Sequence, residues 1–91
     1  MLEIQYGIRF KKELQKSLKQ PGHTPQMLQD VLNYLVKEKP LPDNYRDHKL
    51  QGDYIGYREC HLAPDWLLIY KVEHKKLVLV LARTGSHSEL F

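Results

Sequence analysis

Proton-transferring side chains recur in a fixed order through the second half of this chain. His48 comes first, His61 stands four residues before Asp65, and His87 lies close to the C-terminus. Imidazole both accepts and donates protons near pH 7, so these residues form an acid–base set. Together with Arg83, a cation close to the last histidine, the set suggests metal-free chemistry on a phosphodiester. RNA is the natural substrate for such chemistry.

Length and composition set the frame for this chemistry. A chain of 91 residues supports a single domain, which we expect to span residues 1–91. Fourteen Lys and Arg against eleven Asp and Glu give a net charge of +3, a mild bias toward polyanions. Cys60 is the only cysteine, which excludes an intramolecular disulfide. The N-terminus lacks a signal-peptide pattern, and no apolar run approaches the ~20 residues of a membrane span, so we expect a cytoplasmic protein without membrane contact.

The N-terminal half has the pattern of a strand followed by two helices. Apolar residues alternate over residues 2–6, which is the period of a half-buried strand. Over residues 8–19 they recur at four-residue spacing beside a basic face, which predicts an amphipathic helix. Thr24 followed by Pro25 predicts the start of a second helix, because a hydroxyl caps the first turn and proline suits its first position. The prolines after residue 39 end that helix. We expect these two helices to form a hairpin.

The C-terminal half has a β pattern. Short turn segments around Gly52, Pro64 and residues 73–76 leave connections short enough for antiparallel neighbours. The run 77–82 is apolar on both faces, which predicts an internal strand of the sheet. The expected strands lie around residues 45–50, 55–62, 66–72 and 77–83. The whole chain therefore predicts an α+β domain, in which an N-terminal strand and the helix hairpin pack on a mainly antiparallel sheet.

Several short motifs in this half carry a resemblance to a known family. They are Asp-His-Lys-Leu-Gln-Gly at residues 47–52, Gly-Tyr-Arg at 56–58, Cys-His at 60–61, Pro-Asp-Trp at 64–66, Leu-Ile-Tyr-Lys at 68–71, Arg-Thr-Gly-Ser-His at 83–87 and the terminal Leu-Phe. With these motifs the chain resembles the YafQ branch of the RelE/ParE toxin superfamily, the toxin half of bacterial type II toxin-antitoxin pairs. The resemblance implies a RelE-like fold of the microbial ribonuclease type.

The resemblance also implies a function. Such a toxin is a ribosome-dependent mRNA endonuclease, or mRNA interferase, that acts on mRNA in the ribosomal A site and inhibits translation. It needs no metal or other cofactor. A cognate antitoxin silences it, expected here to be a DNA-binding dimer of the DinJ or RelB type. Operator DNA would be reached only through that antitoxin.

The family motifs assign roles to particular residues. The resemblance implies that His48, His61, Asp65 and His87 are catalytic. It associates Trp66 and Phe91 with the shape of the substrate site and Arg83 with phosphate charge. Lys49 and Arg58 extend a possible basic footprint for RNA, which would bind in a strongly salt-dependent way.

Ordinary structural roles compete with each of these assignments. A lone histidine on a strand is usually exposed or a structural hydrogen bonder, and a tryptophan after a turn is usually core. His23 and His74 lie in turns and are expected to be solvated. A metal site built from His48, His61, His87 and Cys60 is disfavoured, because paired ligand spacings are lacking and strand alternation points Cys60 away from His61.

Two other functions compete with the endonuclease. A ParE-like toxin would poison a protein target such as gyrase, and a plain RNA-binding module would bind RNA without cleaving it. Neither needs a set of three histidines and an aspartate, which favours the enzyme. The pattern leaves open which histidine is acid and which is base. It also leaves open whether Asp65 is a base or orients a neighbouring imidazole.

Overall fold

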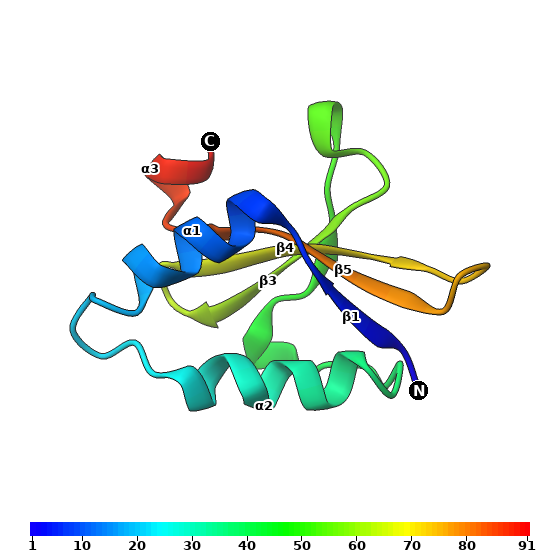
Figure 1. The fold of residues 1–91 in the computed structure, drawn as a ribbon. Coiled ribbons are helices and arrows are strands. Elements are labelled where there is room, and N and C mark those ends of the chain that lie inside the picture. The colour runs from blue at the N-terminus through cyan, green and yellow to red at the C-terminus, as the bar shows by residue number, and fades with distance from the viewer.

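The fold is a single mixed sheet with helices on both of its faces (Figure 1). The computed structural model describes residues 1–91. Its elements are β1 (Glu3–Tyr6), α1 (Ile8–Ser17), α2 (Pro25–Leu35), β2 (His48–Lys49), β3 (Arg58–Ala63), β4 (Trp66–Glu73), β5 (Val78–Gly85) and α3 (His87–Leu90), with 3-10 helices at Asp43–Tyr45 and Gly52–Tyr54. None of the helices is long and apolar enough to cross a lipid bilayer.

The sheet has the order β1-β5-β4-β3-β2. Strands β2 to β5 form an antiparallel meander, and β1 joins its edge parallel to β5. The expectation of an α+β domain with a mainly antiparallel sheet is therefore confirmed. Strand β5 lies between β1 and β4, as its apolar residues on both faces predicted.

Strand alternation divides the apolar residues between two cores. The main core joins the sheet to the first two helices through residues such as Phe10, Val31 and Leu68. A smaller core on the other face contains Leu67, Ile69 and Leu90. Figure 1 shows α2 on one side of the sheet and α3 with the Gly52–Tyr54 turn on the opposite side. The second face thus carries little helical cover.

Local signals account for most element boundaries. The Thr24 side chain accepts a hydrogen bond from the Met27 N–H, so the predicted cap of α2 is confirmed. The predicted strand over residues 45–50 was wrong except at His48–Lys49, because a 3-10 turn and the left-handed backbone of Arg46 (φ 52°) interrupt it. Helix α3 was missed, although its capping-box pair, a serine followed three residues later by a glutamate, is readable in the sequence.

An ion pair ties the C-terminal helix to α1. Lys16 Nζ lies 2.8 Å from Glu89 Oε2, while the other Glu89 oxygen accepts a hydrogen bond from the Ser86 N–H. The hydrogen bond from Lys16, followed by that from Ser86, lowers the pKa of Glu89 from 4.5 to about 2. Ionised Glu89 therefore holds α3 at both its own N-terminus and the neighbouring helix.

We expect Glu89→Gln to flatten the acid limb of the stability curve. A carboxyl group whose pKa is lowered on folding stabilises the protein above its ordinary pKa, and that contribution disappears as the pH falls through the folded value. For Glu89 this window runs from 4.5 down to about 2. Free energies of unfolding across this range should fall less steeply in Glu89→Gln than in the wild type. Glu3→Gln, at an exposed strand residue, is the control, and parallel curves for all three proteins would contradict the assignment.

Candidate active site

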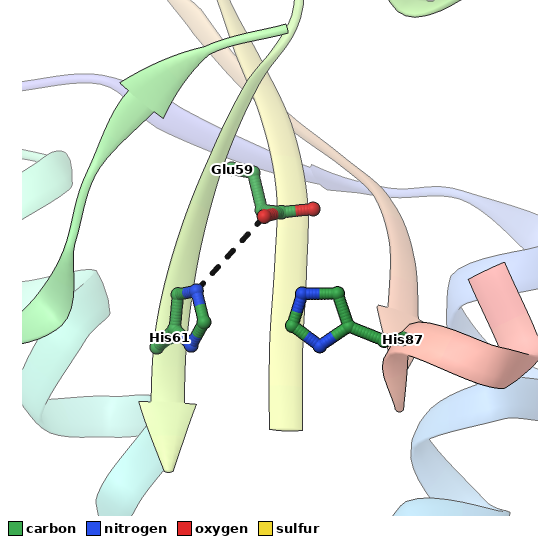
Figure 2. Close-up of side chains that lie close together, drawn as sticks. All are labelled: Glu59, His61 and His87. Carbon is green, nitrogen blue, oxygen red and sulfur yellow. Dashed lines mark ion pairs between the residues drawn. The ribbon is translucent and has the colours of Figure 1, made fainter. Parts of the chain in front are cut away.

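Strands β2 and β3 bring two histidines to one buried glutamate. Glu59 and His61 are two residues apart on β3 and project from the same face, and His48 pairs with Glu59 across the strands. His48 Nε2 lies 3.4 Å and His61 Nε2 4.0 Å from the same oxygen, Glu59 Oε1. Figure 2 shows the carboxylate on the β4 side of β3, joined to His61 by the ion pair, with the His87 ring approaching from the start of α3.

The N-terminus of α3 contributes the third histidine. The rings of His61 and His87 lie 5.7 Å apart between centroids. Asp65, in the turn between β3 and β4, accepts hydrogen bonds at Oδ1 from the backbone N–H of His87 (3.1 Å) and from its Nδ1 (3.2 Å). These two bonds lower the pKa of Asp65, the backbone bond most strongly. Asp65 thus orients the imidazole and leaves its Nε2 free.

Backbone carbonyls orient the other two imidazoles. The Nδ1–H of His48 donates to the Arg46 carbonyl at 2.7 Å, which turns Nε2 toward Glu59. His61 Nδ1 lies 3.3 Å from the Pro64 carbonyl oxygen, again with Nε2 toward the carboxylate. All three rings are therefore positioned through Nδ1. Such second contacts decide which nitrogen is available for chemistry.

The site runs from a buried interior to an open rim. Glu59 is only 4% exposed, and its Oε2 has no hydrogen-bond partner. His61 is also buried, whereas the side chains of His48 and His87 are more than half exposed. A ligand from solvent therefore meets two imidazoles first and finds a carboxylate behind them. This arrangement can remove a proton on one side of a bound group and supply one on the other.

Two arginines named by the sequence analysis are occupied by carboxylates. Arg83 donates from Nε and Nη2 to both oxygens of Glu13 on α1 and from Nη1 to the Tyr54 hydroxyl, and it is 9% exposed. Arg58 donates to Asp47, which also accepts from the Tyr70 hydroxyl. Both guanidinium groups therefore hold elements together, Arg83 as a nearly buried group and Arg58 as one that is 36% exposed.

The two aromatic residues named with these arginines, Trp66 and Phe91, lie in different surroundings. Trp66 is fully buried in the main core and donates to Thr84 Oγ1, which places it away from solvent as a core residue. Its ring stacks on His23 at 4.3 Å, so His23 is not the solvated turn residue that was expected. His74 is exposed, as expected. Phe91 is 63% exposed and packs edge-on against Tyr54.

Lys49 remains exposed on β2, with no ion pair to its side chain. Strand alternation points it to the opposite side from its neighbour His48. It therefore lies beside the histidine cluster without facing into it.

Three residues of the cluster have the types and spacing of metal ligands. Glu59, His61 and His87 each offer a ligand atom, and these atoms lie within 4.8 Å of one another. Cys60 does not contribute, because it is buried in the main core and burial raises the pKa of its thiol. The metal site considered from the sequence included Cys60 as a ligand, and the structure excludes that ligand. The structure points instead to Glu59, a residue that sequence analysis did not single out.

The only sequence signal for Glu59 was its shared strand face with His61. Acidic residues on strands are commonly exposed, so nothing in the composition distinguishes this one. Its burial is decided by the strand pairing and by the C-terminal helix that brings His87 over it.

Comparison with known proteins adds an independent finding. Residues 2–91 match the family described as "Bacterial toxin of type II toxin-antitoxin system, YafQ". The chain is 40% identical over 91 residues to the mRNA interferase toxin YafQ of Escherichia coli K12, covering 98% of this chain and 95% of that protein. It superposes on a metal-bound toxin from Helicobacter pylori with a TM-score of 0.92 at 43% identity, covering 100% of both chains. It also superposes on YafQ in the E. coli DinJ–YafQ complex with a TM-score of 0.84 at 37% identity, covering 100% of this chain and 99% of that one.

We expect Glu13→Gln to destabilise the protein by about 2–4 kcal/mol, because it leaves the nearly buried Arg83 charge without its counterion. Urea unfolding measures the loss. Glu38→Gln is the control, since Glu38 pairs only with the exposed His74, and it should change stability by no more than about 0.5 kcal/mol. In the double variant Glu13→Gln, Arg83→Met part of the loss should be recovered. Equal stability of Glu13→Gln and Glu38→Gln would show that the buried pair is not a structural tie.

Proposed function

Because the chain belongs to the YafQ family of type II toxins, we propose that it is an endoribonuclease that cleaves mRNA on the ribosome and so inhibits translation. We propose that it acts on mRNA in the ribosomal A site and in the cytoplasm, where translating ribosomes are found. The observation that supports it best is the meeting of three imidazoles and a buried carboxylate on one face of the sheet. A protein that only binds has no need of this set.

The chemistry follows from the nucleophile that RNA itself carries. A base removes the proton of the ribose 2'-OH, the oxygen attacks the adjacent phosphorus, and the bond from phosphorus to the 5'-oxygen breaks. An acid then protonates the departing 5'-oxygen, which leaves a 2',3'-cyclic phosphate and a free 5'-OH. His87 Nε2, free in the structure, suits one of these transfers, and His48 or His61 suits the other. Each positioned group contributes roughly 10²- to 10⁴-fold.

The carboxylates act through the imidazoles. Asp65 accepts a hydrogen bond from His87 Nδ1, which supports a role in orienting the imidazole over a role as the base. Glu59 faces Nε2 of both His48 and His61, so its carboxyl group helps to fix the orientation of both rings. Arg83, held by Glu13, serves as a positioning residue that ties β5 to the Tyr54 turn and, through Tyr54, to Phe91.

A partner of the antitoxin class belongs to this proposal. The E. coli relative assembles with DinJ, and this chain superposes on that bound toxin over its whole length. We therefore propose a cognate antitoxin, a DNA-binding dimer through which alone the toxin would reach operator DNA.

The test compares induced expression of the wild type, His87→Ala and His74→Ala in a bacterial host. We expect growth arrest and new mRNA 5' ends from the wild type and from His74→Ala, whose histidine lies on an exposed turn away from the site. His87→Ala should lose at least ~100-fold in cleavage rate, because one proton transfer loses its group. Arrest by all three proteins without new mRNA ends would refute the endonuclease and favour a ParE-like poison.

Metal binding is a second property that a specific observation favours. Glu59, His61 and His87 form a compact nitrogen and oxygen ligand set, and the Helicobacter pylori relative is a metal-bound toxin. Imidazole with carboxylate suits Zn²⁺ and Cu²⁺. A bound ion would occupy the nitrogens that the proposed acid–base steps require, so it would inhibit cleavage.

Calorimetric titration with ZnCl₂ tests this property. We expect wild-type protein and His74→Ala to bind one equivalent, and His87→Ala to bind at least ~10-fold more weakly because one of three ligands is gone. Cleavage by the wild type should be slowed by the ion and restored by a chelator. Equal affinity in all three proteins would place the ion elsewhere, and unchanged cleavage at saturating Zn²⁺ would remove the inhibitory role.

A further inference from the structure

The proposed reaction needs a cation near the phosphate backbone, and the structure narrows the choice among the arginines. The chain has four. Arg58 and Arg83 are held by carboxylates. Arg9 lies on α1, which contributes no residue to the histidine cluster. Arg46 is exposed, and no carboxylate or carbonyl accepts a bond from its guanidinium.

The backbone of Arg46 already belongs to the site. Its carbonyl accepts the Nδ1–H of His48, and its left-handed conformation ends the 3-10 turn Asp43–Tyr45 just before β2. The backbone of Arg46 is therefore held next to His48, and its side chain starts from this point. Lys49, the other free cation nearby, lines a different hollow at the sheet edge together with Ile55 and Lys71.

Arg46 and His61 line the same hollow. It has a volume of about 420 Å³ and lies where the end of β3 faces the 3-10 turn and the first turn of α2. Its other walls are Met27, Asn44, Tyr45, Leu62, Ala63 and Pro64. It therefore combines a guanidinium, an aromatic residue, apolar side chains and an exposed amide, and His61 is part of its lining.

We propose that this hollow binds the nucleotide next to the scissile phosphate, with Arg46 on its phosphate and its base against Tyr45 and Met27. The inference rests on the proposed function and adds a substrate subsite to it. Single-stranded RNA is held by cations along its backbone and by flat apolar or aromatic surface under its bases, and the hollow supplies both. Asn44 at the rim offers a donor and an acceptor to the base edge.

The first test measures binding of a short single-stranded RNA with 2'-O-methyl riboses, which cannot be cleaved by 2'-OH attack. Fluorescence anisotropy gives its Kd for the purified wild type, Arg46→Ala and Arg9→Ala over a salt series. We expect roughly tenfold weaker binding by Arg46→Ala, with a salt slope smaller by about 0.7 because one phosphate contact is lost. Arg9→Ala loses the same charge on another element and should stay within about twofold of the wild type.

A second variant tests the hollow without changing charge. Met27→Trp fills the space between α2 and Tyr45 and should weaken binding while leaving the salt slope unchanged. Arg46→Lys should restore part of the affinity, since it keeps the charge without the planar fork. Circular dichroism on heating confirms that each variant is folded.

The outcome separates this inference from the proposed function. If Arg46→Ala binds RNA as tightly as Arg9→Ala, the subsite is refuted whether or not the wild type cleaves mRNA. If Arg46→Ala binds tenfold more weakly but the wild type cleaves nothing, the hollow stands as an RNA-binding site, whereas the endonuclease fails and with it the placement next to a scissile phosphate.

Discussion

A carboxyl group buried in a sheet is the constraint on which the active face depends. Removing a carboxylate from water costs several kcal/mol unless polar groups surround it. Glu59 meets this cost with His48 and His61, which face one of its oxygens, while the other oxygen has no partner. Strands β2 and β3 must therefore pair in a register that brings both imidazoles to the carboxyl group. β2 is only two residues long, yet its pairing with β3 brings His48 to the carboxylate.

The two faces of the sheet divide structure from chemistry. On the helix side, Cys60, Trp66 and Tyr70 fill the main core, and the Asp47–Arg58 pair closes its edge. On the other face only a small core of Leu67, Ile69 and Leu90 is covered, which leaves room for the histidines. Because neighbouring residues of a strand point to opposite faces, Cys60 in the main core and His61 in the histidine cluster can be adjacent in sequence. The main core on the helix side thus fixes the strands whose other face carries the histidines.

Ion pairs with α1 and a hydrogen bond to Asp65 hold the C-terminal segment in place. Helix α3 has only four residues and would not be stable alone. Lys16 holds it through Glu89, Asp65 caps its first N–H, and Glu13 holds Arg83 on the strand that leads into it. His87 therefore owes its place to residues far away in the chain. The tie from Glu13 also explains why Arg83 is engaged by a carboxylate, whereas Arg46 is exposed and is the candidate for RNA.

The sequence by itself determined the fold class, the cap of α2, the internal position of β5 and the family, because these rest on local periodicity and short motifs. It also named His48, His61, Asp65 and His87, which the structure brings to one face. Only the tertiary structure decided the burial of Glu59, the core position of Trp66 and the capture of Arg83 by a glutamate 70 residues away. Burial and ion pairing are properties of surfaces that meet across strands and helices. No pattern along the chain specifies which charged side chain will find its counterion and which will remain free for a ligand.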